Sequence, residues 1–323
     1  MQAFRLINRE RITLCVRLGT FFGAAVKITM TDIKTFNVIA AEISAATKSH
    51  FEIKTTKSIA GGDINRAFLL QSENQRYFVK LNQPERLAMF KAEFSGLQAL
   101  AKTKTILVPS PIICGQTQTA SFLVLEYVEL QRATAKSERL FGQQLAQLHL
   151  QKQPHFGWEI NNMIGSTPQI NTPTENWIEF WQKYRLGFQL KLVTQKGFGQ
   201  KLERLGELLS ERLADFFVDY RPPTSLLHGD LWGGNVAANS HNQPIIFDPA
   251  CYYGDRETDL AMTELFGGFG RDFYAAYNDV WQLDSGYETR KKLYNLYHVL
   301  NHCVLFGGGY VAQAEKMMQD LLR

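Results

Sequence analysis

The sequence predicts an α+β protein of two lobes, a small β-rich amino-terminal lobe and a larger, mostly helical carboxy-terminal lobe. Apolar strand-like segments are concentrated before residue 128, and apolar residues recur at helical spacing through most of the remaining chain. The 323 residues are enough for two lobes around a large buried core. We place the small lobe at residues 30–128 and the large lobe at residues 129–323, after an amino-terminal extension of residues 1–29.

The composition excludes several classes of protein. Apolar content, 45% of residues, is ordinary for a globular protein, and no apolar run reaches the ~20 residues that a membrane-spanning helix needs. We therefore expect no membrane partner. The cysteines form no Cys-x-x-Cys pair, so they give no metal or disulfide signal and favour a reducing cytoplasm. They are Cys15, Cys114, Cys251 and Cys303.

The formal net charge of +4 comes entirely from the amino-terminal extension. Residues 1–29 hold five basic side chains and one acidic side chain, and the rest of the chain carries 30 of each. Without a bulk positive charge in the folded part, we expect no nucleic-acid partner.

The small lobe opens with a predicted helix over residues 31–48, where apolar residues recur at helical spacing. Strand-like segments follow around residues 51–58, at Leu69 and Leu70, and at residues 77–81. This order predicts a hairpin followed by a third strand.

Two glycines and a lysine in this region are candidate nucleotide-binding residues. Gly61 and Gly62 lie in the predicted hairpin turn, and glycine lets the backbone approach a phosphate closely. Lys80 lies near the end of the third strand, as in the nucleotide-covering part of a kinase. A lysine there needs a carboxylate partner, and the helix predicted over residues 85–102 offers Glu93. The alternative is that Lys80 and Glu93 are ordinary surface charges.

Residues 121–128 read as an apolar strand that ends in polar groups, after a turn at residues 108–111. We interpret the end of this strand as the hinge between the lobes. Leu125, Glu126 and Tyr127 would offer backbone hydrogen bonds to adenine. The Glu126 side chain is either a contact in its own right or a charge at the end of the strand.

The large lobe is predicted to be helical, apart from an irregular loop at residues 154–173. An aromatic stripe at helical spacing runs from Trp177 to Tyr184 and is interpreted as core-facing. His298 and His302 are spaced i and i+4, which can bind zinc, but we interpret them as structural. Further helices are expected at residues 140–150, 199–217, 287–305 and 308–322, and one begins within residues 255–262. Asp259 either anchors the central loop or simply favours the amino terminus of that helix. His149 is interpreted as a packing or loop residue.

The central motif of the chain is His228-Gly-Asp230, followed by Asn235 and then by Asp248. Four residues separate Asp230 from Asn235, which is the spacing of a kinase catalytic loop with Gly in place of the usual Arg. Asp230 would accept the proton of the substrate hydroxyl, while Asn235 and Asp248 would hold Mg²⁺ against the nucleotide phosphates. Either fragment alone would be read as a turn or a strand end. Their order and spacing favour the site.

The central stretch with Asp248-Pro-Ala250, together with residues 162–169 and 300–310, resembles the fructosamine kinases, also called ketosamine-3-kinases. This family belongs to a wider group of aminoglycoside phosphotransferase-like and choline-kinase-like enzymes. The resemblance runs from about Met30 to the carboxyl terminus, and Glu93 aligns with the family's lysine partner.

The resemblance implies a protein-kinase-like fold, ATP and Mg²⁺ as cofactors, and an enzyme that phosphorylates the 3-hydroxyl of a ketosamine sugar. The cysteine pattern favours the cytoplasm as its location. The substrate would be a small molecule or a glycated protein, and the unstable product would release the free amine, which amounts to deglycation and protein repair. The sequence leaves open the sugar, whether fructose, ribulose or erythrulose, and the oligomeric state.

Two alternatives remain open. The chain could be a small-molecule kinase for an aminoglycoside-like or choline-like amine, although residues 162–169 and 300–310 disfavour this. It could also be a non-catalytic nucleotide-binding pseudokinase, although the candidate site lacks none of its expected residues.

The extension also has two readings. Its Arg-rich, acid-poor composition is compatible with a targeting segment. We favour Met30 as the natural start, because the family resemblance begins there.

Overall fold

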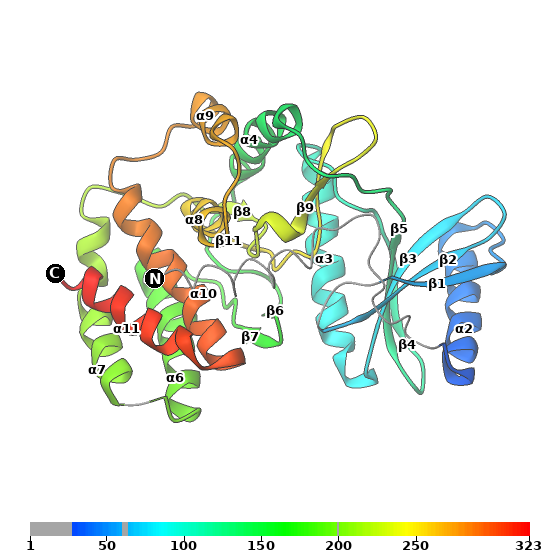
Figure 1. Ribbon diagram of the computed structural model, residues 1–323, viewed down its shortest axis with the longest axis horizontal. Coiled ribbons are helices and arrows are strands. Elements are labelled where there is room, and N and C mark those ends of the chain that lie inside the picture. Colours follow the sequence, from blue (N-terminus) through cyan, green and yellow to red (C-terminus); the bar gives the residue numbers. More distant parts are fainter. Residues whose placement is uncertain (1–27, 60–63, 199) are drawn as a thin grey trace, which may run out of the picture.

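The computed structural model describes residues 28–59, 64–198 and 200–323. An antiparallel sheet of five strands, in the order β1-β2-β3-β5-β4, comes first (Figure 1). We call it, with its two flanking helices, the sheet region. A mostly helical region follows, so the predicted fold class is confirmed.

The sheet region has the following elements: α2 (Met30–Thr47), β1 (Thr55–Ile59), β2 (Arg66–Gln71), β3 (Arg76–Asn82), a 3-10 turn (Pro84–Arg86), α3 (Leu87–Thr103), β4 (Pro111–Gln116) and β5 (Ser121–Glu126). The helical region contains α4 (Ala135–His149), β6 (Asn162–Ile164), β7 (Thr167–Gln169), α5 (Trp177–Trp181), a π-helical turn (Gln182–Leu186), α6 (Gly187–Gln195), α7 (Gln200–Glu211), a 3-10 segment (Leu213–Phe217), β8 (Ser225–Leu227), a 3-10 turn (Gly233–Asn235), β9 (Val236–Ala238), β10 (Pro244–Ile246), β11 (Tyr252–Gly254), α8 (Glu257–Leu265), α9 (Arg271–Val280), α10 (Tyr287–Phe306) and α11 (Gly309–Leu321).

Helices α2 and α3 cover opposite faces of the sheet, and α3 lies on the side of the helical region (Figure 1). Strand β5 shows why its sequence is an unbroken apolar run. Phe122 and Val124 pack in the cluster with α2, whereas Leu123 and Leu125 pack in the cluster with α3. Since successive side chains of a strand point to opposite faces, a strand covered on both sides needs apolar residues at every position.

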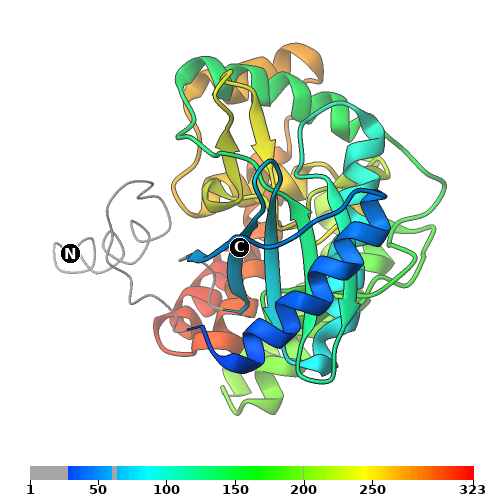
Figure 2. The same ribbon diagram turned by 90° about the vertical axis from the view of Figure 1, so that its right-hand side faces the viewer.

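Helix α2 crosses the outer face of the sheet (Figure 2) and is fixed at its first turn. The Thr29 hydroxyl accepts a hydrogen bond from the Asp32 N–H, and the Asp32 carboxylate accepts one from the Thr29 N–H at 2.8 Å. The same carboxylate binds the Arg66 guanidinium through two 2.8 Å contacts. Arg66 is the first residue of β2, so this ion pair ties the helix to the strand that leaves the candidate nucleotide-covering turn.

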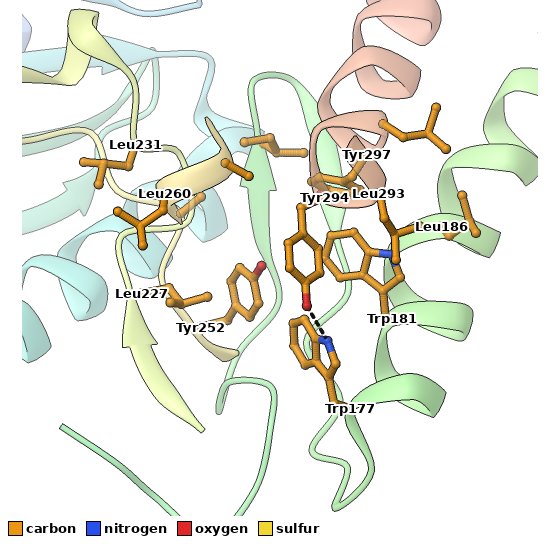
Figure 3. Close-up of a cluster of buried hydrophobic side chains, with 14 of the residues drawn as sticks. Trp177, Trp181, Leu186, Leu227, Leu231, Tyr252, Leu260, Leu293, Tyr294 and Tyr297 are labelled. Carbon is orange, nitrogen blue, oxygen red and sulfur yellow. Dashed lines mark hydrogen bonds between the residues drawn. The ribbon is translucent and has the colours of Figure 1, made fainter. Parts of the chain in front are cut away.

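The core of the helical region is rich in aromatic side chains (Figure 3). Trp177 and Trp181 project from α5, and the Trp177 indole donates a hydrogen bond to the Tyr294 hydroxyl of α10 at 3.1 Å. Trp177, Phe180 and Trp181 are buried, which confirms the core-facing reading for most of the predicted stripe.

Several sequence expectations were wrong in detail. Residues 154–173 were predicted as an irregular loop but contain the hairpin of β6 and β7. The helix expected from residue 140 begins at Ala135, where Thr134 provides a capping box. The helix expected over residues 199–217 ends at Glu211 and gives way to a 3-10 segment. Strand β4 was not predicted, because its half-exposed residues show no alternation.

None of the helices in the described part of the chain is long and apolar enough to cross a membrane.

The capping box predicts the effect of replacing Thr29. Thr29→Ala leaves the Asp32 N–H without its acceptor, so the first turn of α2 should lose about 1 kcal/mol of local stability. Faster amide exchange over residues 30–47, measured by mass spectrometry, is the expected result. Thr31→Ala is the matched control, since the Thr31 side chain is exposed and forms no hydrogen bond with the described residues. Equal exchange in the two variants would contradict the cap. A chain that begins at Met30 also lacks Thr29, so we expect faster amide exchange in its first helix as well.

Candidate active site

The candidate catalytic residues lie in and around two short antiparallel strand pairs. Strand β8 pairs with β11, and β9 pairs with β10. Residues 228–230 follow β8, Asn235 precedes β9, and Asp248 follows β10. The β9–β10 hairpin therefore brings Asn235 and Asp248 to the same end, where the Phe247 N–H donates to the Asn235 carbonyl at 3.2 Å.

Asp259, on α8, anchors the catalytic loop. Its buried carboxylate accepts the N–H of His228 at 2.7 Å and the N–H of Gly229 at 2.8 Å. His149 contacts the same carboxylate at 3.2 Å through Nε2. Burial alone would raise the pKa of Asp259, but its hydrogen bonds and the neighbouring histidines lower it below the ordinary value. Of the two readings of Asp259, the loop anchor is the one that its contacts favour.

The backbone conformation at residue 229 explains why this loop carries glycine where many kinases carry arginine. The φ of Gly229 is +80°, a left-handed conformation that glycine adopts without a steric penalty. A Cβ atom at this position would lie 2.1 Å from the carbonyl oxygen of Ala250. The loop and the segment after Asp248 therefore touch backbone to backbone.

Asp230 is partly exposed and is oriented by Asn235. The Asn235 amide donates to the Asp230 carbonyl at 2.8 Å and contacts its carboxylate at 3.3 Å. Burial, with a further contribution from the negative charge of Asp248, raises the pKa of Asp230 to about 7. A carboxylate with a pKa in this range is matched to proton transfer near neutral pH.

Lys80 joins the sheet region to this loop. Its ammonium group lies 2.6 Å from the Glu93 carboxylate of α3 and 2.6 Å from Asp248. Burial would lower the pKa of Lys80, but the charges of Asp248 and Glu93 raise it above the ordinary value. The predicted Lys80–Glu93 ion pair is thus present in the structure.

The expected hinge follows β5. The Glu126 N–H donates to the Ser110 carbonyl at 2.8 Å, and the Glu126 carboxylate accepts from the Ser110 hydroxyl at 2.8 Å. Both groups of Glu126 therefore bind Ser110 in this structure. The role of Leu125, Glu126 and Tyr127 in binding adenine stays a prediction. Gly61 and Gly62 lie outside the described residues.

Asn235 and Asp248 have the chemistry that a magnesium site requires. The Asn235 amide nitrogen is directed at Asp230, so its amide oxygen is the atom that could coordinate a metal ion. The Asp248 side chain is 48% exposed, and only one of its carboxylate oxygens contacts Lys80. Mg²⁺ is commonly held by one or two such oxygens together with substrate phosphates. In the described residues, no group of three or more His, Cys, Asp and Glu side chains is arranged so that it could hold a metal ion.

The contacts of two residues at this site, His149 and Asn82, were not predicted from the sequence. His149 was expected to be a packing or loop residue, but its buried ring links Asp259 to the Tyr277 hydroxyl, 2.8 Å from Nδ1. Asn82 was not singled out, yet its amide donates to Asn65 at 2.7 Å and to the Ile64 carbonyl at 3.0 Å. It therefore fixes the chain where it leaves the candidate glycine turn.

The fold and the site define a phosphotransferase of the kinase type, with a sheet region that supplies Lys80 and a helical region that supplies the loop carboxylates. The fructosamine kinase family model matches residues 35–323. The chain belongs to this family.

Individual relatives agree with this assignment. A protein of Synechocystis sp. named "Probable ketoamine kinase" is 45% identical over 289 residues, which is 89% of this chain and 97% of the relative. The chloroplastic protein-ribulosamine 3-kinase of Arabidopsis thaliana is 42% identical over 275 residues, 84% of each chain.

Solved structures share the fold. A Haemophilus somnus protein described as a fructosamine-3-kinase superposes with a TM-score of 0.81 at 32% identity, covering 88% of this chain and 97% of the other. An ADP-bound aminoglycoside phosphotransferase superposes with a TM-score of 0.59 at 16% identity, covering 87% and 99%. The second likeness supports the fold alone.

The buried ion pair predicts that stability and nucleotide binding respond differently to mutation. Lys80→Met leaves Glu93 buried without a counter-charge, so it should lower the free energy of unfolding by about 3 kcal/mol. It should also weaken ADP binding. Adding Glu93→Gln should restore most of the stability but none of the affinity. The measurements are urea unfolding and calorimetric titration with ADP. If the double variant bound ADP with wild-type affinity, Lys80 would not belong to the nucleotide site.

Proposed function

We propose that this chain is an ATP-dependent kinase that phosphorylates the 3-hydroxyl of the sugar in ketosamines. The observation that carries the proposal is the placement of Asp230 beside Asn235 and Asp248, with Lys80 reaching the same point from the sheet region. Family membership and relatives named as ketoamine and ribulosamine kinases support the substrate class.

In the proposed reaction, the sugar hydroxyl oxygen attacks the γ-phosphorus of ATP while the bond from that phosphorus to the leaving oxygen of ADP breaks. The Asp230 carboxylate orients the hydroxyl and takes its proton, and the Asn235 amide holds that carboxylate in place. Lys80 binds the nucleotide phosphates and is itself oriented by Glu93. Asn235 and Asp248 would hold Mg²⁺, whose charge would neutralise the charge that develops on the phosphates.

The 3-phosphorylated ketosamine would then break down and release the free amine, so that the overall activity is deglycation. The amine belongs to a small molecule or to a protein side chain. Scattered cysteines favour the cytoplasm as the compartment.

The two alternatives are weaker. A pseudokinase reading has no support from the site, because Lys80, Glu93, Asp230, Asn235 and Asp248 are all present and Lys80 contacts two of the carboxylates. An aminoglycoside-kinase reading has support only from fold neighbours at low sequence identity.

The role of Asp230 can be tested by replacing it with an isostere. Asp230→Asn keeps the shape of the side chain but removes the proton acceptor, so kcat should fall by about 10²- to 10⁴-fold. Affinity for Mg·ADP should change little, because Asn235 and Asp248 hold the metal. The substrates are fructose-lysine, ribulose-lysine and erythrulose-lysine, assayed for ATP consumption. Asp219→Asn makes the same change at an exposed site and is the control.

Wild-type turnover by Asp230→Asn would contradict the role of Asp230. Failure of the wild-type protein to phosphorylate any of the three ketosamines, with Mg·ADP binding intact, would contradict the substrate class.

A further inference from the structure

Asp248 has a strained backbone that must be held in place by its surroundings. Its φ of +58° lies in the left-handed region, which is unusual for a residue with a side chain. Such a conformation persists only where neighbouring contacts over-determine it. On the amino-terminal side, Phe247 provides two of these contacts. Its N–H donates to the Asn235 carbonyl at 3.2 Å, and its carbonyl oxygen lies 3.0 Å from His228 Nε2.

On the carboxy-terminal side of Asp248, the contacts that hold the backbone come from a different part of the chain. Pro249 has no N–H to donate, so the first backbone N–H after Asp248 that can be held is that of Ala250. The Ala250 N–H donates to the His228 carbonyl at 2.8 Å. The Gln169 amide donates to the Ala250 carbonyl at 3.2 Å, and the Asn162 amide donates to the Cys251 carbonyl at 2.8 Å.

Gln169 and Asn162 form one unit at the base of the β6–β7 hairpin. They are register partners across the hairpin, and the Gln169 amide also donates to the Asn162 side-chain oxygen at 2.8 Å. Tyr297, labelled in Figure 3, donates its hydroxyl to the other side of the Gln169 amide at 2.8 Å. Gln169 is 1% exposed and Asn162 is 7% exposed. Every polar atom of the Gln169 side chain therefore has a partner.

A buried arginine supports this unit from behind. Arg185 donates to the Asn171 side-chain oxygen at 2.8 Å and to the Ile170 carbonyl at 2.6 Å, and Asn171 donates to Asn162 at 3.0 Å. Arg185 and Asn171 are both 0% exposed, and Arg185 has no acidic partner among the described residues. Its guanidinium instead lies 4.1 Å from the centroid of the Tyr252 ring, which provides a cation–π contact.

The helix around Arg185 has an unusual backbone. Residues Gln182–Leu186 form a π-helical turn that closes with the Gly187 N–H donating to the Gln182 carbonyl. A Cβ atom on Gly187 would lie 2.5 Å from that carbonyl oxygen, so the turn depends on glycine. Single π-helical turns are rare and frequently occur at functional sites.

We propose that Gln169 and Asn162 are positioning residues of the phosphoryl-transfer site, with Asn171 and Arg185 as their support. They hold the backbone just after Asp248 and thereby fix the carboxylate that binds the metal. This inference rests on the metal-binding role of Asp248 within the proposed function. A buried polar network costs free energy that apolar packing would avoid, so a network aimed at these two carbonyls indicates a need for a fixed backbone there.

The test is the Mg²⁺ dependence of ADP binding. Gln169→Met keeps the size of the side chain and removes its donors to Ala250 and Asn162. Substitutions behind a metal ligand typically cost 10- to 100-fold in metal affinity, so the Mg²⁺ concentration that half-restores tight ADP binding should rise by about that factor. ADP binding in EDTA should be unchanged. Calorimetric titration with ADP over a series of Mg²⁺ concentrations gives both values, and no ketosamine is needed.

Gln189→Met is the matched control. Gln189 is also 0% exposed and lies one turn from Arg185, but it contacts Asn301 and Tyr297 rather than the Ala250 or Cys251 carbonyl. It should lower the thermal midpoint without changing the Mg²⁺ dependence. Asn162→Leu, which removes the donor to Cys251, should give the Gln169→Met result and replaces that variant if it does not fold.

An unchanged Mg²⁺ dependence in Gln169→Met, or in Asn162→Leu if that variant replaces it, would overturn the inference, as would an equal shift in Gln189→Met. Loss of ADP binding in EDTA as well would also overturn it, because the defect would then lie outside the metal site. The proposed substrate class fails separately, if the wild-type protein binds Mg·ADP normally but phosphorylates no ketosamine.

Discussion

The Asp259 carboxylate is the interaction on which the rest of the site depends. It is 1% exposed, yet two backbone N–H groups and a histidine surround it, so its charged form is stabilised in spite of burial. Charge-assisted hydrogen bonds of this kind are stronger than neutral ones, and an uncompensated buried carboxylate would be costly. Because both N–H groups belong to consecutive residues, His228 and Gly229, the carboxylate fixes the direction in which the chain enters Asp230. The short strands β8 and β11 could not do this alone.

The turn at His228 and Gly229, once anchored by Asp259, packs against the residues on both sides of Asp248. His228 bonds the chain on both sides of Asp248, through Phe247 and Ala250, and Gly229 meets the Ala250 carbonyl at a distance that excludes any side chain. Asp230 and Asp248, the proposed proton acceptor and the proposed metal-binding carboxylate, are thus held by a shared set of backbone contacts rather than by two independent loops. For this reason a substitution at Gly229 should disturb Asp248 as much as Asp230. Asn235 adds a third link, since it contacts Asp230 and its carbonyl accepts from Phe247.

The sequence predicted those parts of the structure whose signal is local. Strand β5 was predicted because a strand buried on both faces is apolar throughout, and the Asp230–Asn235 spacing was visible because both residues lie in one loop. Strand β4 was missed because it is an edge strand that begins with proline and is half-exposed along most of its length. Asp259 had two readings, since an acid in the first turn of a helix is favourable whether or not it anchors a loop. Residues 162–169 carried part of the family resemblance, but nothing in the sequence indicated the contacts of Gln169 and Asn162. Three-residue strands are too short to show a period, and the residues that Gln169 and Asn162 bind lie more than 80 positions away.

The charges at the site follow from the same geometry. Lys80 shares one positive charge between Glu93 and Asp248. Burial is the main cause of the raised pKa of Asp230, and the negative charge of Asp248 adds to it. Burial raises the pKa of Glu93 as well, and the three carboxylates outnumber Lys80, which contacts two of them. On the proposed roles, Asn235 and Asp248 would hold a divalent cation. Its charge would offset the part of the rise in the pKa of Asp230 that comes from Asp248, and it would compete with Lys80 for Asp248. Lys80 would then be available to the nucleotide phosphates while Glu93 keeps it in place, and Asp230 would lose its proton more readily and so be able to accept one from the substrate. The raised pKa of Asp230 therefore reflects burial first and the negative charge of Asp248 second, and a cation at Asp248 would reduce only the second contribution.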